Sequence, residues 1–131
     1  MSKPVRFVLA VVAALVTWTV VATIINFGLR AAISGYRAEE LALSFSLGSQ
    51  VARLALALVA TVAAAIAAMV VSRGVVASAL VAGLLMLAMF IPMHIRIWSH
   101  FPVWYHLFFL TSLPTVSYAT ARWWACRTKN A

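Results

Sequence analysis

Four apolar runs, each close to or above the length that crosses a membrane, dominate this chain of 131 residues. A helix needs roughly 20 predominantly apolar residues to span the hydrocarbon region. We expect membrane spans at about residues 5–29, 47–71, 75–95 and 102–123, and we expect the first run to be a retained helix because it is longer than a signal peptide's apolar region. Short connections make successive helices antiparallel neighbours. The sequence therefore predicts an all-α single domain, an integral membrane four-helix up-and-down bundle.

The composition excludes several other classes of protein. Hydrophobic residues make up 66% of the chain and charged residues 9%, whereas a soluble domain is nearer half apolar and a quarter charged. The same apolar excess excludes a disordered chain, and a single cysteine excludes a disulfide scaffold within one chain. The net charge of +8 does not indicate nucleic acid, because the basic residues stand singly or in small groups between apolar runs.

The basic residues predict an orientation in the membrane. Four spans place both termini on one side, which then carries six basic residues: Lys3, Arg6, Arg73, Arg122, Arg127 and Lys129. The other side carries three, Arg30, Arg37 and Arg96, together with both acids. Short loops rich in Lys and Arg remain in the cytoplasm. We therefore expect a multi-pass protein of the bacterial inner (plasma) membrane with cytoplasmic termini.

Small residues recur on one face of the predicted second span and at one point of the third. Within lipid, helices associate through close contact of small side chains and through inter-helix hydrogen bonds. The expected packing interface comprises Ala57, Ala60, Ala64, Ala68 and Gly83. This face can join helices of one bundle, or it can receive another membrane protein, and the sequence does not separate the two.

Polar and ionisable side chains gather in the outer half of the predicted spans. Such residues inside the hydrocarbon are functional candidates. The candidate ligand-binding set is Asn26, Gln50, Arg53, His94, Arg96, Tyr105 and His106. Arg53 either extends its stem to the outer surface or faces the bundle and binds an anion. We expect no acid at its depth, because Glu40 lies 13 residues earlier, about 20 Å away along a continuous helix.

The histidines are spaced symmetrically. His94 and His106 each lie six residues from His100, so a hairpin with His100 at its tip places them at similar depth. Two imidazoles so placed can ligate a metal or a haem iron. They can also be interfacial residues that hydrogen-bond, and the spacing matches no ligand motif. We therefore expect no metal and no cofactor, with His94 and His106 as weak metal candidates.

One segment of the chain resembles a known group of proteins. Its pattern is W-x-x-F-P-x-W-Y-H-L, formed by Trp98, Phe101, Pro102, Trp104, Tyr105, His106 and Leu107. It resembles the outer loop that joins the last two spans in certain small bacterial four-helix inner-membrane proteins. The resemblance covers the last third of the chain. It implies the fold and the membrane location, and it transfers no mechanism because that group has no assigned activity.

Three functions fit these observations. The first is a non-enzymatic membrane protein that acts through protein partners or oligomerisation, as an accessory or structural subunit. No catalytic residues are expected, since the chain has no Asp and its two acids are adjacent. The alternative is outer-face binding or transport of a small anionic ligand or lipid headgroup in a polar mouth around Arg53 and His106. The third is metal or haem binding by His94 and His106.

Overall fold

The computed structural model describes residues 1–130, and all of its regular elements over that range are helices. Its elements in chain order are α1 (Lys3–Ala32), α2 (Tyr36–Ala42), α3 (Leu47–Ser72), α4 (Val76–Arg96), the short 3-10 helix η1 (Trp98–His100) and α5 (Val103–Lys129). The predicted all-α class is confirmed. No β-strand occurs in the described residues.

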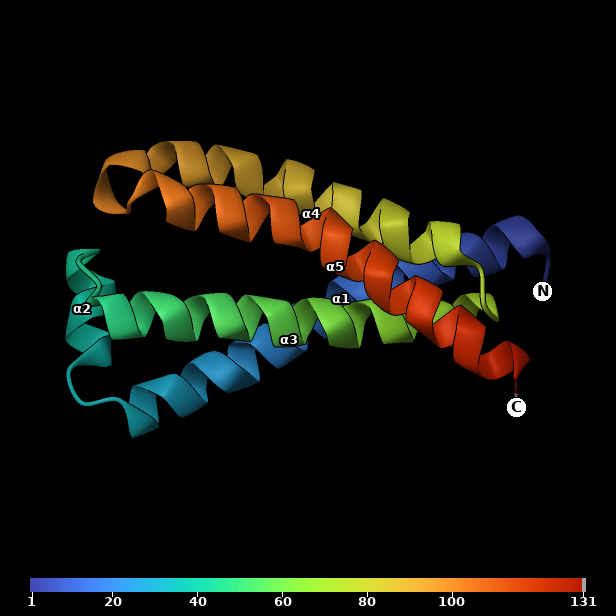
Figure 1. Cartoon of the computed structure of the whole chain (residues 1–131), viewed down its shortest axis with the longest axis horizontal. Coiled ribbons are helices and arrows are strands. Elements are labelled where there is room, and N and C mark those ends of the chain that lie inside the picture. Colours follow the sequence, from blue (N-terminus) through green and yellow to red (C-terminus); the bar gives the residue numbers. More distant parts are fainter. Residues whose placement is uncertain (131) are drawn as a thin grey trace.

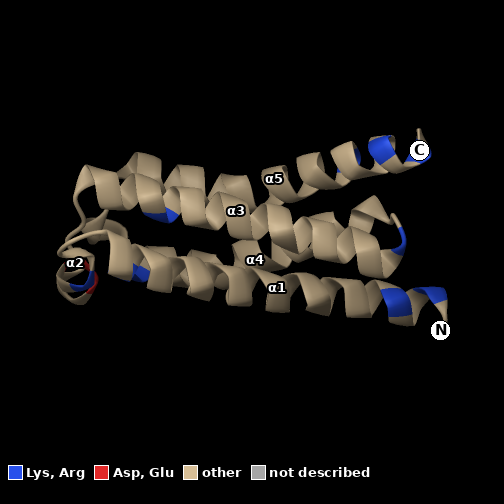
Figure 2. Ribbon diagram, turned by 90° about the horizontal axis from the view of Figure 1, so that it is seen from below, with Lys and Arg blue, Asp and Glu red and all other residues tan. Residues whose placement is uncertain are grey.

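The four long helices, α1, α3, α4 and α5, run alternately in opposite directions (Figure 1). Both termini lie at one end of the molecule, and α2 lies across the other end. The most extensive contacts join α1 to α3, α4 to α5 and α3 to α5. Figure 2 shows most Lys and Arg residues at the end with the termini, whereas the acidic residues lie at α2.

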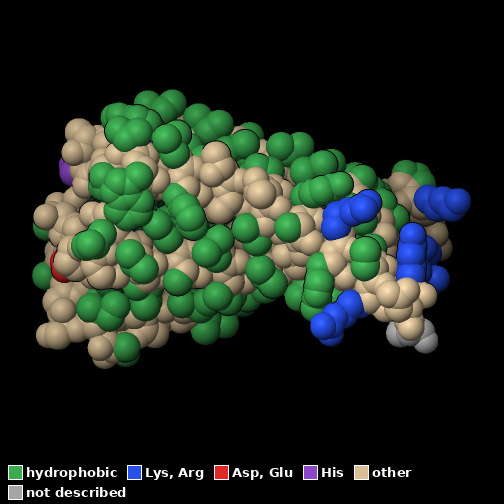
Figure 3. All heavy atoms as spheres, viewed as in Figure 1, with side chains coloured by type: hydrophobic (Ala, Val, Ile, Leu, Met, Phe, Trp, Pro, Cys, Tyr) green, Lys and Arg blue, Asp and Glu red, His purple; other side chains and the backbone are tan. Residues whose placement is uncertain are grey.

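Three of the long helices, α1, α3 and α4, are long and apolar enough to cross a membrane. Helix α5 has 27 residues but is less apolar, so the crossing predicted for 102–123 stays a prediction. Apolar side chains are exposed along the outer faces of the helices (Figure 3). This exposed surface is what lipid would cover in a membrane protein.

The helix is interrupted between α2 and α3. The expectation of one continuous helix from Glu40 to Arg53 is therefore wrong. Leu43 has φ 50° and ends α2 in the left-handed conformation. The Ser46 hydroxyl then caps α3, because it accepts a hydrogen bond from the backbone N–H of Ser49 at 3.3 Å. Serine at this position satisfies an N–H that the helix leaves unpaired. The break turns α2 across the end of the long helices.

The small residues of α3 lie inside this single chain. The exposed fractions of Ala57, Ala60, Ala64 and Ala68 are 0–1%, so this face packs against the neighbouring helices. Gly83 of α4 lies directly against the backbone of α5. A Cβ atom added there would lie 2.9 Å from the Leu113 carbonyl oxygen and 2.9 Å from the Pro114 Cα of α5.

We predict that Gly83→Ala destabilises the fold by about 1–3 kcal/mol, because the added methyl group would meet backbone atoms that cannot rotate away. The matched control is Gly28→Ala in α1, where an added Cβ meets nothing within 4 Å. The control should stabilise its helix by up to about 1 kcal/mol. The free energy of unfolding, measured by denaturant titration in mild detergent, checks both values. Equal effects of the two substitutions would contradict the close α4–α5 contact.

Candidate functional site

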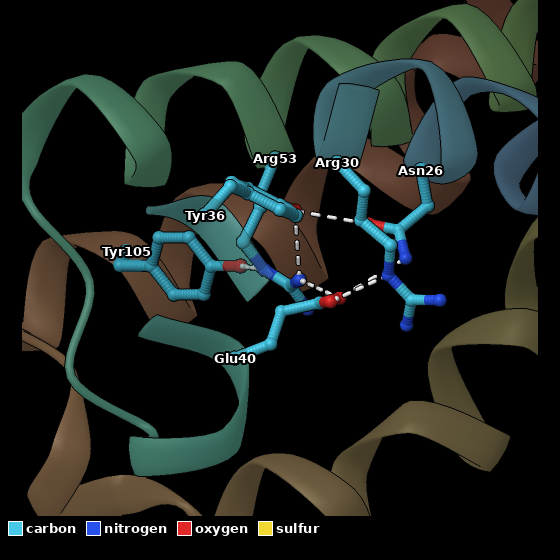
Figure 4. Close-up of polar contacts among 6 residues, drawn as sticks. All are labelled: Asn26, Arg30, Tyr36, Glu40, Arg53 and Tyr105. Atoms are coloured by element: carbon cyan, nitrogen blue, oxygen red, sulfur yellow. Dashed lines mark hydrogen bonds and ion pairs between the residues drawn. The ribbon is translucent and has the colours of Figure 1, made fainter. Parts of the chain in front are cut away.

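Arg53 is the centre of a polar cluster at the end of the molecule that carries α2 (Figure 4). Its Nη1 donates to the Tyr36 hydroxyl at 3.1 Å and lies 3.7 Å from Glu40 Oε1. Its Nε donates to the Tyr105 hydroxyl at 3.4 Å. The guanidinium carbon also lies 4.7 Å from the centre of the Phe45 ring. Side chains of α2, α5 and the α2–α3 connection therefore surround the cation of α3.

Glu40 joins the two arginines of this cluster. One carboxylate oxygen accepts a hydrogen bond from Arg30 Nε at 2.6 Å, and the other accepts one from Asn26 Nδ2 at 3.0 Å. The Tyr36 hydroxyl donates to Asn26 Oδ1 at 2.9 Å, which links α2 to α1 a second time. Tyr36 itself is fully buried. The cluster thus contains two cations and one anion, with a net charge of +1.

The expectation that no acid lies at the depth of Arg53 is wrong. It assumed a continuous helix from Glu40 to Arg53. The break after Leu43 removes that helical separation, because α2 turns across the end of the molecule and returns Glu40 to Arg53. A partly buried cation gains more from a nearby carboxylate than an exposed one does.

A cavity of about 410 Å³ lies beside this cluster. Helices α1 and α4 provide most of its lining, and α2, α3, α5 and Ile97 provide the rest. Its polar lining comes from Thr19, Thr23, Asn26, Arg30, Glu40, Arg53, His94 and Tyr105, and its apolar lining includes Trp18, Ala22, Leu56, Phe90 and Phe109. Phe27 and Met93 also line the cavity and are 61% and 49% exposed, so it opens at the surface between α1 and α4.

Trp18 forms part of the apolar lining of the cavity, and contacts with two other helices hold its ring in place. Its indole N–H donates to the Thr61 hydroxyl of α3 at 3.1 Å, and that hydroxyl donates to the Ala57 carbonyl at 2.7 Å. The Trp18 ring lies 4.9 Å from the Phe90 ring of α4, measured between centroids. One side chain of α1 therefore contacts two neighbouring helices at mid-depth.

His94 and His106 are buried and hydrogen-bond directly to each other. Their Nδ1 atoms are 2.8 Å apart, and His106 Nε2 lies 3.2 Å from the Trp98 carbonyl oxygen. A carbonyl oxygen only accepts, so the neutral tautomer of His106 that fits both contacts carries its proton on Nε2 and accepts on Nδ1. His94 therefore donates from Nδ1. The contact between His106 and the outer loop holds η1 against the start of α5.

This geometry gives no support to metal binding by the pair. Metal–nitrogen bonds of about 2.0–2.1 Å at a tetrahedral angle hold two nitrogens about 3.3 Å apart. At 2.8 Å, the Nδ1 atoms bond each other and leave no room for an ion between them. Across residues 1–130, no group of three or more His, Cys, Asp or Glu side chains could hold a metal ion.

The structure brings together most of the predicted site residues, but not all of them. Asn26, Arg53, His94 and Tyr105 line the cavity, whereas His106 lies behind His94. The remaining two predicted residues lie elsewhere: Gln50 donates to the Phe45 carbonyl at 3.1 Å, and Arg96 is exposed at the end of α4.

The site also contains four residues that were not predicted from the sequence: Tyr36, Glu40, Arg30 and Trp18. The signal that could have found the first two is the serine-rich segment Ser44–Ser49, which is typical of a helix break followed by a cap. A break there allows α2 to lie near the outer end of α3. The periodicity of α1 already placed Arg30 on the same face as Asn26.

Neither a scan against models of protein families nor searches of curated proteins and of solved structures gave a match to this chain. The resemblance of the last third to small four-helix inner-membrane proteins therefore stays a prediction. The geometry of the cluster and its cavity is therefore the basis for a functional proposal.

We predict that α2 detaches from the long helices at acid pH. Burial raises the pKa of Glu40, but hydrogen bonds from Arg30 and Asn26 and the charges of Arg30 and Arg53 outweigh it and hold the pKa below the ordinary value of 4.5. A lowered pKa contributes stability that is complete above the unfolded value and is lost as the pH falls through the folded value. Amide hydrogen exchange in α2 should therefore accelerate, relative to the intrinsic rate, as the pH falls below the ordinary glutamate pKa of 4.5.

The control for this prediction uses the neighbouring acid. Glu40→Gln should remove most of the pH dependence of exchange in α2, because the amide has no charge to lose; a smaller part should remain, since hydrogen bonds with Ser49 and Ser46 also lower the pKa of Glu39. Glu39→Gln should retain most of it, since Glu39 forms no ion pair in the described residues. An unchanged pH dependence in Glu40→Gln would contradict the role of this carboxylate.

Proposed function

We propose that this chain is an integral membrane protein of the bacterial inner membrane, with α1, α3, α4 and α5 crossing as a four-helix up-and-down bundle and both termini in the cytoplasm. Three helices with the length and hydropathy of spans support this proposal. The exposed apolar side chains of the long helices agree with it. The charge distribution in Figure 2 supports the orientation, because cytoplasmic segments carry the excess of Lys and Arg.

The single cysteine, Cys126, provides a test of this orientation. It is exposed near the end of α5, on the side proposed to be cytoplasmic. A membrane-impermeant maleimide added to spheroplasts should label it only after the membrane is permeabilised. The control, Ser99→Cys in a Cys126→Ser background, places a thiol on the exposed outer turn and should be labelled at once. Labelling of Cys126 in sealed spheroplasts would contradict the proposed topology.

We infer that the protein binds an amphipathic molecule with an anionic headgroup in the cavity between α1 and α4, without converting it chemically. The observation that carries this function is the lining of the cavity, which combines a charged cluster with an apolar wall. Its volume of about 410 Å³ lies within the usual range of ligand sites, about 300–1,000 Å³. The opening between two proposed spans gives a molecule in the bilayer direct access.

The arginines specify the charge of the headgroup. Arg30 uses Nε to bond Glu40, and its terminal nitrogens form no hydrogen bond within residues 1–130. A guanidinium presents paired N–H groups that match the oxygens of a carboxylate or a phosphate. The Arg30 side chain is 40% exposed, so it remains accessible to a ligand. Together with the net charge of +1, this arrangement favours a carboxylate or phosphate headgroup.

The apolar wall of the cavity indicates that the part of the ligand beyond its headgroup is apolar. Leu56, Phe90 and Phe109 present aliphatic and aromatic surface from three different helices. An alkyl or acyl chain gains about 0.8 kcal/mol for each methylene group that it transfers from water to such a surface, and far less when it leaves lipid. The polar headgroup contacts therefore supply most of the selectivity.

Action through protein partners or oligomerisation is a second proposal, supported by a row of exposed side chains on α1. Val8, Val12, Val16, Val20 and Ile24 recur every four residues and are 48–64% exposed. Such a row can contact another membrane helix as well as lipid. The alanines of α3, in contrast, are already buried within the chain, so the interface expected from the sequence serves internal packing.

Filling the cavity tests the ligand proposal. We predict that Ala22→Phe lowers the occupancy of a co-purified amphiphile by at least about tenfold, because Ala22 is 9% exposed and lines the cavity. The control is Val20→Phe, which adds similar bulk two residues away on the exposed face. Native mass spectrometry of protein extracted gently from its own membranes measures the added mass.

The outcomes separate the two proposals. An amphiphile mass on the wild type and on Val20→Phe, but not on Ala22→Phe, supports binding in the cavity. A mass that all three retain equally, or a protein without adduct, would contradict it. A co-purified protein that Val20→Phe loses would instead support action through the exposed face of α1.

A further inference from the structure

A second cavity, of about 560 Å³, lies at the opposite end of the molecule from α2. It is lined by Lys3, Pro4, Arg6 and Phe7 from the start of α1, and by Ser72, Arg73 and Val75 from the turn between α3 and α4. Segments about 70 residues apart in sequence therefore form one site. These cations also contribute to the predicted orientation, and the cluster around Arg53 does not involve them.

The positive charge of this cavity is not neutralised by any acidic side chain in the described residues. Lys3, Arg6 and Arg73 contribute three positive charges, and none of them forms an ion pair within residues 1–130. Both acids of the chain, Glu39 and Glu40, lie in α2 at the other end. Figures 2 and 3 show the accumulation of Lys and Arg at the end with the termini. An anion entering the cavity therefore meets cations without competing carboxylates.

The apolar part of the lining narrows the class of anion. Phe7 packs against the hydrophobic core, and Pro4 and Val75 extend this apolar surface beside the three cations. A free inorganic anion needs only the cations. A phospholipid headgroup carries a phosphate next to a glycerol and its acyl chains, so it uses both kinds of surface.

We propose that this cavity binds the phosphate headgroup of an anionic phospholipid from the membrane leaflet on the side of the termini. Arg6 and Arg73 hold the phosphate oxygens, and Lys3 adds charge at the surface. Phe7 and Val75 contact the glycerol region of the lipid. This inference rests on the proposed membrane crossing, but it is independent of the ligand proposed for the outer cavity.

Native mass spectrometry of the full-length protein in detergent, titrated with phosphatidylglycerol or phosphatidylcholine, tests the proposal. We expect each cation that contacts the headgroup to contribute about fivefold to anionic lipid affinity, the effect typical of one Lys or Arg at a membrane surface. Arg6→Gln with Arg73→Gln should therefore weaken phosphatidylglycerol binding by about 25-fold, and phosphatidylcholine binding by much less because its choline cation already offsets the phosphate. The matched control, Arg122→Gln with Lys129→Gln, removes two charges at the same end but outside the cavity, and it should weaken binding by less than about threefold.

A charge-conserving variant and a competition experiment distinguish the remaining explanations. Arg6→Lys with Arg73→Lys retains the charges and should keep binding within about fivefold, which separates loss of charge from loss of fold. Equal loss in the cavity pair and the control pair would overturn the site, since attraction would then follow total charge alone. Competition by inorganic phosphate at concentrations equal to those of the lipid would overturn a lipid as the ligand. Cys126 accessibility reports failure of the membrane proposal separately.

Discussion

The free-energy cost of holding a cation within an apolar helix explains how side chains are arranged at the end of the molecule that carries α2. Arg53 lies inside a helix that is otherwise almost wholly aliphatic, and a charge there loses hydration unless protein groups replace the water. Four side-chain groups replace this water around the guanidinium: the hydroxyl groups of Tyr36 and Tyr105, the carboxylate of Glu40 and the ring of Phe45. The position of α2 follows from this requirement, because two of these groups belong to that short helix.

Side-chain size explains why the cavity beside Arg53 does not continue along the whole molecule. Where α3 presents Ala60, Ala64 and Ala68, these side chains are fully buried and neighbouring helices approach closely. Nearer α2, the facing side chains are Arg53, Tyr105 and Phe109, and large side chains hold helix axes farther apart. The cavity beside Arg53 therefore ends where the alanine face of α3 begins, and the second cavity lies beyond that face, at the end with the termini.

The sequence predicted the long helices well because their signals are local. An apolar run of sufficient length specifies a helix without information from the rest of the chain, and the spacing of Ala57 to Ala68 specifies its buried face. The position of Glu40 depends instead on where one helix stops and the direction in which the chain then turns. That direction follows from contacts such as Tyr36 with Asn26 and Arg53, which join residues distant in sequence and carry no periodic signal. The symmetry of the histidines was visible, but their direct hydrogen bond depends on the geometry of the α4–α5 hairpin.

The histidine pair also has a consequence for proton movement. A relay passes a proton along groups that can each accept on one side and release on the other. The series from His94 through His106 ends at the Trp98 carbonyl, which accepts a hydrogen bond but has no proton to release. The two rings therefore form a terminated chain, with each proton assigned to one nitrogen. Such a chain joins α4, η1 and α5 through two hydrogen bonds, and it leaves no proton to pass beyond the Trp98 carbonyl.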